Sequence, residues 1–431
     1  MKEISEKKIS EKKPNIWDVA VIGGGPAGMM SAGRAGELGA KVILLEKNPE
    51  LGRKLLVTGG GRCNVTNAEF DNRKFLEKFR GDGKFLFSAF SEWNSKNTIE
   101  FFESHSVPTK VENEGRVFPV SNSSESVLGV LLSYIKKGGV TVKTNSAVKE
   151  LVGEAGIIKS VILENGEEIF AKSFIIATGG KSYPKTGSTG DGFVWLSKLG
   201  HKMIKPDSAL VPVNIKDEWV RNLQGVAMPE IKISIFQDDK KIESKKGKIL
   251  FTHFGISGPT ILNMSRKINE LIPYGDVIIS LDLMPNFDFS TIKTELERIF
   301  KENINKKFKN ALSSIVPSAL VSTIAEKSGI DEDKPNHSIT REEKIRLMHV
   351  LKDIRMEVHS LMSPENAIVS SGGVDLNEVD FKTMTSKLYP NLYLTGDILN
   401  INRPSGGYSL QICWTTGFVA GSNASSISKN I

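Results

Sequence analysis

Glycines at positions 23, 25 and 28 have the spacing with which a chain turns from a strand into a helix around a diphosphate. Gly23 allows the tight turn, Gly25 lets the backbone approach a pyrophosphate, and Gly28 lets the helix pack closely on the strand. Glu46 lies about 18 residues beyond Gly28, where a carboxylate can accept hydrogen bonds from both hydroxyls of an adenosine ribose. These residues predict binding of a cofactor that contains ADP.

The segments around these residues have the patterns that would position them. Residues 18–22 are largely apolar and precede the glycines, as expected for a buried parallel strand. A helix-like run follows, whose N-terminal N–H groups would face the phosphates. The apolar residues 42–45 then end directly before Glu46. Strand, glycine turn, helix, strand and acid in this order predict the dinucleotide-binding βαβ unit.

A second glycine-rich stretch, residues 52–67, follows the acid closely. It holds three consecutive glycines between Thr58 and Arg62, and Asn64 comes soon after. Amide N–H groups and a nearby cation can follow a phosphate or the edge of a flavin closely. The alternative is a flexible surface loop without a ligand. The position directly after the acid favours a contact with the cofactor.

Residues 52–67, taken together with residues 18–28, resemble the BaiN-like (YhiN-like) flavoproteins, a bacterial family related to glutathione-reductase-type FAD enzymes. The resemblance extends over nearly all of residues 16–422. It implies FAD as the tightly held dinucleotide. It also implies an α/β fold in which a discontinuous Rossmann-like FAD-binding domain carries an inserted β-barrel-like domain and a small helical domain.

The glycine motif and the resemblance together define the expected cofactor-binding residues. They are Gly23, Gly25, Pro26, Ala27, Gly28, Glu46, Lys47, Arg53, Lys54, Thr58, Gly60, Gly61, Arg62, Asn64, Val148, Thr178, Gly179, Gly180, Gly396, Asp397, Gly406, Gly407 and Tyr408. In the FAD enzymes that this chain resembles, an aspartate like Asp397 holds the ribityl chain and the pyrophosphate. The N–H groups where the last helix begins could stabilise negative charge on a reduced flavin.

Composition and periodicity suggest where the parts of the chain begin and end. Charged residues occupy 8 of the first 15 positions, which we expect to be a disordered basic tail. Short alternating runs begin near position 206 and give way to a helical pattern near 290. The expected parts are the tail 1–15, the FAD-binding domain 16–205, the inserted β domain 206–285, the inserted helical domain 286–357 and the second part of the FAD-binding domain 358–425.

The net charge of +7 and a pI near 9.0 are compatible with a polyanionic partner such as RNA, or with solubility alone. No apolar run reaches the roughly 18 residues that a membrane span needs, and the N-terminus lacks a signal-peptide core. A cytoplasmic protein without a membrane partner is therefore expected. The two cysteines and six histidines show no metal-ligand spacing, so no metal is expected.

The source of electrons and of a proton is less evident from the residues. No second NAD(P)H-binding domain is visible, and residues 181–192 contain glycines without the strand, helix and acid of another nucleotide site. NAD(P)H is therefore expected as a transient reductant. Cys63, whose pKa the neighbouring Arg62 could lower, and His253 in the β domain are the candidate proton donors. The alternatives are a packed cysteine and a hydrogen-bonded loop histidine.

Members of the family that the chain resembles are associated with three substrate classes. These are uridine in large-subunit ribosomal RNA, the conjugated double bond of dehydro bile acids, and a small primary amine oxidised by oxygen. The first two share hydride transfer to a C=C bond conjugated to a carbonyl, followed by protonation. Ene-reduction of ribosomal RNA is the leading expectation. Reduction of a small enone, amine oxidation and a flavin-binding role without catalysis stay open.

Overall fold

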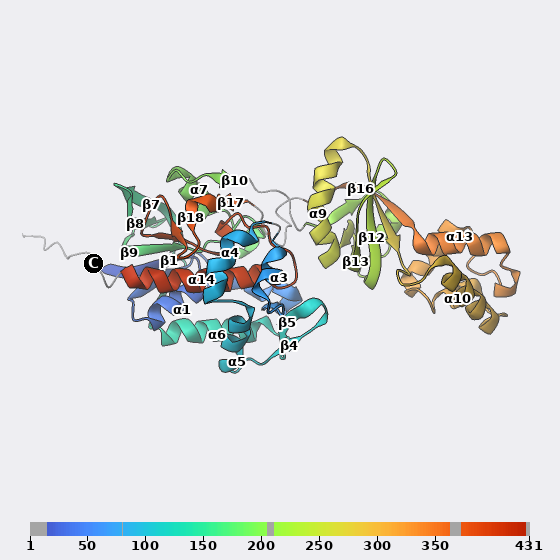
Figure 1. Ribbon diagram of the computed structural model, residues 1–431, viewed down its shortest axis with the longest axis horizontal. Helices are drawn as coiled ribbons and strands as arrows, with labels where there is room; N and C mark the ends of the chain where they lie inside the picture. The colour runs from blue at the N-terminus through green and yellow to red at the C-terminus, as the bar shows by residue number, and fades with distance from the viewer. Residues whose placement is uncertain (1–14, 80, 205–210, 363–371, 428–431) are drawn as a thin grey trace, which may run out of the picture. The chain divides into compact units, whose positions relative to one another are not determined.

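The computed structural model describes residues 15–79, 81–204, 211–362 and 372–427 (Figure 1). The chain divides into two compact units, and each is described by itself. Unit 1 comprises residues 1–206 and 371–431, and unit 2 comprises residues 207–370. The expected tail, apart from Asn15, and the expected boundary at 205–206 lie outside the described residues.

Unit 1 is built on a mixed sheet whose central strands are parallel. Their order is β6 (Thr141–Lys143), β2 (Val42–Leu45), β1 (Ile16–Ile22), β9 (Glu168–Ile176) and β20 (Leu392–Leu394). The hairpin of β7 (Val148–Glu154) and β8 (Ile157–Leu163) pairs with β9, while β19 (Thr385–Ser386) and β18 (Val379–Asp380) continue beyond β20. Because β20 comes from the far side of the insertion, the sheet joins both parts of unit 1.

Helices cover this sheet and form smaller layers beside it. They are α1 (Pro26–Glu37), α2 (Arg53–Leu56), α3 (Asn72–Glu77), α4 (Gly83–Glu92), α5 (Ser95–Ser104), α6 (Ser124–Lys137), α7 (Asp191–Lys198) and α14 (Tyr408–Ile427). Small sheets pair β3 (Thr66–Asn67) and β4 (Thr109–Val111) with β5 (Arg116–Pro119), and β10 (Met203–Ile204) with β17 (Gly373–Val374).

Two glycines on α14 allow it to lie directly against α1 (Figure 1). A Cβ atom on Gly417 would lie 2.6 Å from the Ala27 carbonyl oxygen, and one on Gly421 would lie 2.4 Å from that of Ser31. Both distances are too short for a Cβ atom, so these two positions require glycine. The close approach places the end of the chain against the helix that begins at the glycine turn.

Unit 2 contains a closed antiparallel barrel and a group of helices. The barrel order is β11 (Val213–Ile215), β14 (Gly255–Ser257), β13 (Lys240–Thr252), β12 (Ala227–Gln237), β15 (Val277–Asp282) and β16 (Ile354–Leu361). The helices are α8 (Glu218–Arg221), α9 (Pro259–Leu271), α10 (Phe289–Glu302), α11 (Phe308–Leu312), α12 (Val321–Ser328) and α13 (Arg341–Lys352). The predicted fold class, a Rossmann-like domain with an inserted barrel, is confirmed.

The barrel and the helices of unit 2 share one hydrophobic core. Ile233 and Ile279 of the barrel belong to the same buried cluster as Leu296 and Phe308 of the helices. The last barrel strand, β16, pairs with both β15 and β11, so the expected boundary after residue 357 falls inside a strand. That boundary is wrong because strand β16 follows the last helix in sequence and closes the barrel.

Replacing Phe308 by alanine should destabilise the barrel as well as the helices, because its side chain is fully buried in the shared core. We expect F308A to lower the free energy of unfolding of unit 2 by about 3–5 kcal/mol. Hydrogen exchange in increasing urea would measure this at both β15 and α10. The exposed Ile304 provides the control I304A, and loss of protection in α10 alone would contradict a shared core.

Candidate cofactor-binding site

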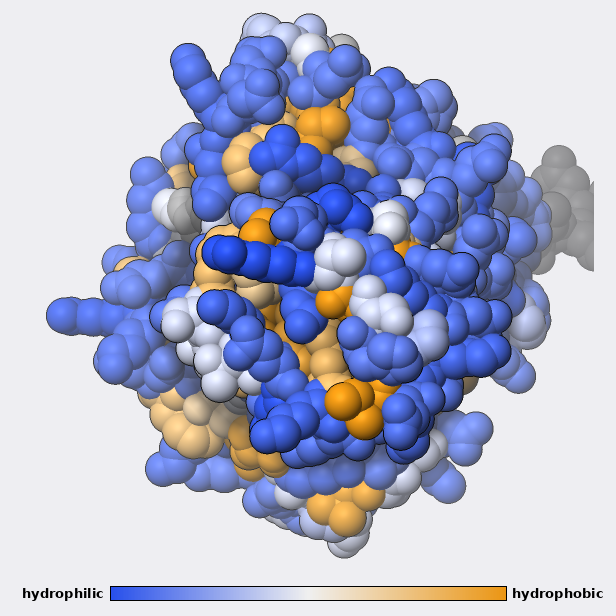
Figure 2. Space-filling model, turned by 90° about the vertical axis from the view of Figure 1, so that its right-hand side faces the viewer, coloured by the Kyte–Doolittle hydropathy of each residue, from blue (hydrophilic) through white to orange (hydrophobic). Residues whose placement is uncertain are grey.

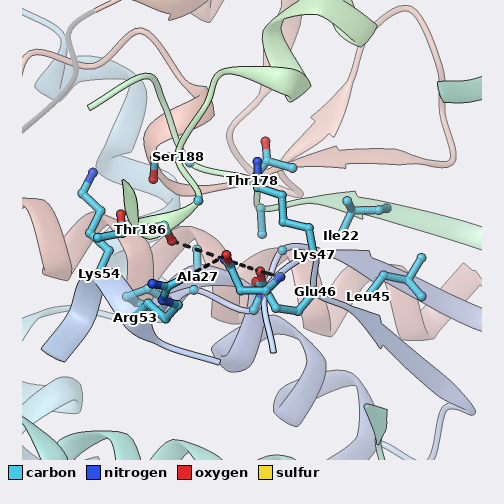
Figure 3. A pocket seen from close by; sticks show the side chains of 18 of the residues that line it. Ile22, Ala27, Leu45, Glu46, Lys47, Arg53, Lys54, Thr178, Thr186 and Ser188 are labelled. Atoms are coloured by element: carbon cyan, nitrogen blue, oxygen red, sulfur yellow. Dashed lines mark hydrogen bonds between the residues drawn. The ribbon is translucent and has the colours of Figure 1, made fainter. Parts of the chain in front are cut away.

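A cavity in unit 1 lies where the carboxyl ends of β1, β2 and β9 meet the start of α1 (Figure 3). This is the edge of a parallel sheet at which nucleotide cofactors bind. Its lining includes many predicted residues, namely Gly23, Gly25, Pro26, Ala27, Glu46, Lys47, Arg53, Lys54, Val148, Thr178, Gly179 and Asp397. The cavity therefore brings together residues from both sequence parts of unit 1.

The glycine turn has the geometry that the sequence predicts. Gly23 has a φ of 106°, and a Cβ atom there would lie 2.6 Å from the carbonyl oxygen of Ala177. A Cβ atom on Gly28 would lie 1.8 Å from the Gly23 carbonyl oxygen. A Cβ atom on Gly25, by contrast, would meet no described atom within 4 Å. Two glycines are thus required by the fold, whereas Gly25 leaves its open side to the cavity.

Glu46 is held in place by the backbone at the end of β2. One carboxylate oxygen accepts a hydrogen bond of 2.7 Å from Gly24 N–H, and the other accepts bonds from the backbone and side-chain nitrogens of Asn48 at 2.8 and 2.7 Å. The side chain is buried, so these bonds fix its orientation. The carboxylate retains further lone pairs that ribose hydroxyls can reach.

Basic side chains from α2 and the end of β2 hold the segment 181–191 beside the cavity (Figure 3). Lys47 pairs with Asp191 at 2.7 Å, and Lys54 donates a 2.6 Å hydrogen bond to Ser182 Oγ. Arg53 donates to the Asn48 side chain at 3.0 Å. These contacts order a glycine-containing segment that has no regular secondary structure over most of its length.

Two buried polar atoms beside the cavity make no hydrogen bond within the described part of the chain, namely Thr178 Oγ1 and Asp397 Oδ1. Asp397 Oδ1 lies 3.1 Å from Arg403 in an ion pair, so Thr178 Oγ1 is the atom left for a ligand. Burial raises the pKa of Asp397, but the charges of Arg403 and Lys54 outweigh burial and hold that pKa below its ordinary value. The Thr178 hydroxyl and the ionised Asp397 carboxylate line the same cavity as Gly25. Both groups can hydrogen-bond to a dinucleotide that carries hydroxyl groups.

Other predicted positions do not line this cavity. They are Gly28, Thr58, Gly60, Gly61, Arg62, Asn64, Gly180, Gly396, Gly406, Gly407 and Tyr408. Gly28 supports the turn from behind. The Arg62 guanidinium is engaged elsewhere, because it pairs with Glu112 at 2.9 Å and lies 3.9 Å over the Phe118 ring. A contact between Arg62 and the cofactor is therefore not supported by this cavity and stays a prediction.

The segment that follows the triple glycine, residues 64–67, lies beside the start of α14. A Cβ atom on Gly407 would be 2.2 Å from the Thr66 carbonyl oxygen, and Asn67 donates a 3.2 Å hydrogen bond to the Gly406 carbonyl. The side-chain oxygen of Asn64 is buried here without a hydrogen-bond partner in the described part of the chain. Tyr408 packs instead on an aromatic cluster, with its ring centroid 4.7 Å from that of Phe75.

Several lining residues were not predicted from the sequence. They include Asn48, Ser146, Thr186, Ser188, Asp191, Trp195, Thr395 and Cys413. The glycines of residues 181–192 were a signal for part of this set, but their pattern indicated only that no separate nucleotide site lies there. The segment instead contributes to the same cavity as the first glycine turn.

Cys63 is not an activated thiol. Its side chain is fully buried, and burial raises its pKa to about 12. The expectation of a lowered pKa is wrong because burial outweighs the opposing effect of a hydrogen bond with Thr58, while Arg62 is paired with Glu112. Burial also raises the pKa of Cys413 to about 12. Cys63 is therefore a packed residue.

His253 lies in the turn between β13 and β14 of unit 2. Its side chain is exposed, and its ring centroid is 4.8 Å from that of Phe254. An exposed imidazole can exchange protons with solvent or a ligand. A role for His253 in proton transfer stays a prediction.

Two further searches of the described residues concern ions and membranes. Within residues 15–79, 81–204, 211–362 and 372–427, no group of three His, Cys, Asp or Glu side chains could hold a metal ion. None of the helices that the structure describes is both long and apolar enough to cross a bilayer.

Substitution of two glycines should separate cofactor binding from folding. We expect G25A to fold with an unchanged melting temperature but to bind FAD at least about tenfold more weakly, since the methyl group enters open space beside the cavity. G28A should fail to fold stably, because its Cβ atom would overlap the Gly23 carbonyl oxygen. Calorimetry and FAD titration measure both effects. Unchanged FAD affinity in G25A would contradict this placement of the pyrophosphate.

Comparison with curated proteins finds relatives that match over nearly the whole chain. A ribosomal RNA dihydrouridine synthase of Escherichia coli is 28% identical over 93% of this chain and 96% of its own length. A 3-dehydro-bile acid delta(4,6)-reductase of Clostridium scindens is 28% identical over 94% of this chain and 98% of its own length.

Solved structures share the fold at lower identity. A flavocytochrome c3 fumarate reductase matches with a TM-score of 0.54 and 18% identity over 96% of this chain and 79% of that one. A 3-ketosteroid-delta4-(5alpha)-dehydrogenase of Rhodococcus jostii matches with a TM-score of 0.53 and 14% identity over 97% and 98%. The family model for the Rossmann domain of HI0933-like proteins matches residues 17–423. The chain therefore belongs to the HI0933-like family, whose members are FAD-dependent oxidoreductases with a Rossmann-type cofactor domain.

Proposed function

We propose that this protein is an FAD-dependent ene-reductase, and that its substrate is uridine in large-subunit ribosomal RNA. The observation that carries the reaction type is the full-length match to relatives named for two related reductions. Dihydrouridine is uridine whose C5=C6 bond, conjugated to a carbonyl, has been reduced. A delta(4,6)-reductase of a dehydro bile acid likewise reduces a C=C system conjugated to a ketone. The shared reaction is more strongly supported than either substrate.

The cavity supplies the groups that such an enzyme needs to hold its cofactor. We assign Glu46 to the ribose hydroxyls and Asp397 to a ribityl hydroxyl. The turn from Gly23 to Gly25 would hold the pyrophosphate at the N-terminus of α1. The loop around Asn64 and the start of α14 would then lie toward the flavin ring, because Asn64 has an unused buried oxygen.

Reduced FAD, when bound, supplies a hydride to the electron-poor carbon of a conjugated C=C bond. The chain itself must exclude water, orient the substrate and bring a proton to the adjacent carbon. His253 is the proposed proton donor, because it is an exposed imidazole next to an aromatic ring that could contact a planar substrate. NAD(P)H is the proposed reductant and would visit the flavin transiently.

The charge distribution bears on how RNA would bind. Residues 207–370 contain 23 basic and 23 acidic residues, so the inserted unit carries no net charge. The surplus of +7 therefore belongs entirely to the remainder of the chain. The insertion as a whole therefore offers no surplus of positive charge to RNA, and RNA phosphates should instead meet unit 1. The face shown in Figure 2 is mostly hydrophilic, with apolar residues gathered in a strip near its centre and in patches toward its lower edge.

A small conjugated enone is the second candidate substrate. The bile acid reductase is as similar to this chain as the RNA enzyme, and a neutral inserted unit does not require a polyanionic substrate. Oxidation of a primary amine stays a prediction without support from these two relatives.

Anaerobic incubation of the flavoprotein with NADPH or NADH and unmodified large-subunit ribosomal RNA should yield dihydrouridine at one position. Nucleoside mass spectrometry would detect uridine that has gained two hydrogens, and the yield should fall with rising salt. A parallel reaction with a steroid dienone tests the second candidate. Reduced flavin with no change in uridine would contradict the RNA proposal, and loss of the dienone absorbance would then support the enone.

Replacing His253 by glutamine should slow turnover without releasing FAD. We expect kcat to fall by about a hundredfold, since a positioned general acid contributes that much or more. His337 is also exposed and lies in the same unit, so H337Q is the matched control. Flavin content measured by absorbance should be equal in both variants. Equal turnover in H253Q and H337Q would remove His253 from the mechanism.

A further inference from the structure

Arg403 is a buried cation just before α14. Its side chain has no solvent exposure, although guanidinium groups are seldom fully buried. One terminal nitrogen donates hydrogen bonds to the carbonyl oxygens of Gly396 at 2.8 Å and Leu399 at 3.3 Å. Burial of a charge is costly unless an opposite charge or hydrogen bonds compensate it. The position of this cation therefore calls for an explanation.

The opposite charge is the carboxylate of Asp397. The second terminal nitrogen of Arg403 lies 3.1 Å from a carboxylate oxygen of Asp397. This contact is an ion pair without a well-aligned hydrogen bond. Among the described residues, the Nε of Arg403 also has no hydrogen-bond partner. Lys54 approaches the other oxygen of Asp397 to 3.6 Å. Asp397 is thus held between two cations.

The two residues differ in their access to the cavity. Asp397 lines it, together with Lys54 and Cys413, whereas Arg403 does not. Arg403 can therefore act on a ligand only through Asp397 or through the backbone of residues 396–399. A carboxylate accepts hydrogen bonds at both oxygens, but a neutral carboxyl group must donate from one of them. The ionisation of Asp397 consequently decides how it can bind a hydroxyl group.

We propose that Arg403 is a positioning residue that keeps Asp397 ionised and oriented, so that the cavity presents a carboxylate to a hydroxyl of FAD. This inference rests on the proposed binding of FAD through Asp397. The charged and titratable groups that face Asp397 are Arg403, Lys54 and the neutral thiol of Cys413. Arg403 contributes the closer charge, and its carbonyl contacts fix the turn that carries Asp397.

The pH dependence distinguishes this role from a purely structural clamp. In the wild type the pKa of Asp397 lies below its ordinary value, so the group stays a carboxylate throughout pH 5.5 to 8 and FAD affinity should be flat over that range. In R403M, burial would be opposed by Lys54 alone, and the pKa should rise. Asp397 would then become protonated as the pH falls through this range, and FAD affinity would fall with it.

The experiment titrates FAD into the cofactor-free forms of wild type, R403M, R403K and the double variant R403M/D397N. We expect the dissociation constant of R403M to increase by about tenfold between pH 8 and 5.5, because one proton is taken up. R403K retains the charge and should stay flat. The double variant should bind weakly but without pH dependence, because asparagine does not titrate. A flat profile in R403M would overturn the proposal and leave Arg403 as a clamp.

A readout without cofactor separates this proposal from the proposed function. Asp397 with a lowered pKa stabilises the folded protein above its ordinary pKa, and that contribution is lost as the pH falls. In R403M the raised pKa reverses the sign, so the contribution is lost as the pH rises. The difference in unfolding free energy between R403M and R403M/D397N should therefore change with pH. No change would overturn the proposal even if FAD binds. Failure of the wild type to bind FAD, with this pH dependence present, would contradict the proposed function and leave only the charge balance between Arg403 and Asp397.

Discussion

The contact between Gly28 and the carbonyl oxygen of Gly23 is the constraint on which the cofactor site depends. A side chain at position 28 would overlap that oxygen, so α1 can begin directly behind the turn only when both positions are glycine. The same turn orients the N–H group of Gly24, which donates a hydrogen bond to the carboxylate of Glu46 at the end of β2. One steric requirement thus aligns a helix N-terminus and a carboxylate from a different strand.

The site also depends on how charges are balanced. Lys54 and Arg403 surround the largely buried Asp397, whereas Lys47 and Asp191 form a partly exposed pair. A buried charge is stable only when its partner is correctly placed, so the pair of Arg403 and Asp397 ties the segment before α14 to the turn after β20. The partly exposed pair connects the end of β2 to the first residue of α7 and contributes less stability.

The residues predicted from spacing alone lie close together in the sequence, whereas Val148, Thr178 and Asp397 were predicted from the family resemblance. The βαβ unit follows from local spacing, and its strands, turn and helix are confirmed. Contacts made by tertiary packing were not accessible. The burial of Cys63, the pairing of Arg62 with Glu112, and the place of β16 in the barrel all involve residues far apart in the chain. The zero net charge of residues 207–370, by contrast, follows from the sequence alone, because their basic and acidic residues are equal in number.

The insertion between β9 and β20 determines the order in which the strands around the site are synthesised. Strand β9 is synthesised with β1 and β2, but its neighbour β20 emerges only after all of unit 2. Part of β9 therefore remains an unpaired edge during translation, when such edges invite misplaced pairing. Asp397 and the glycines of α14 that pack on α1 are also synthesised only after unit 2. A cofactor can therefore bind to this carboxylate only late in translation or after it.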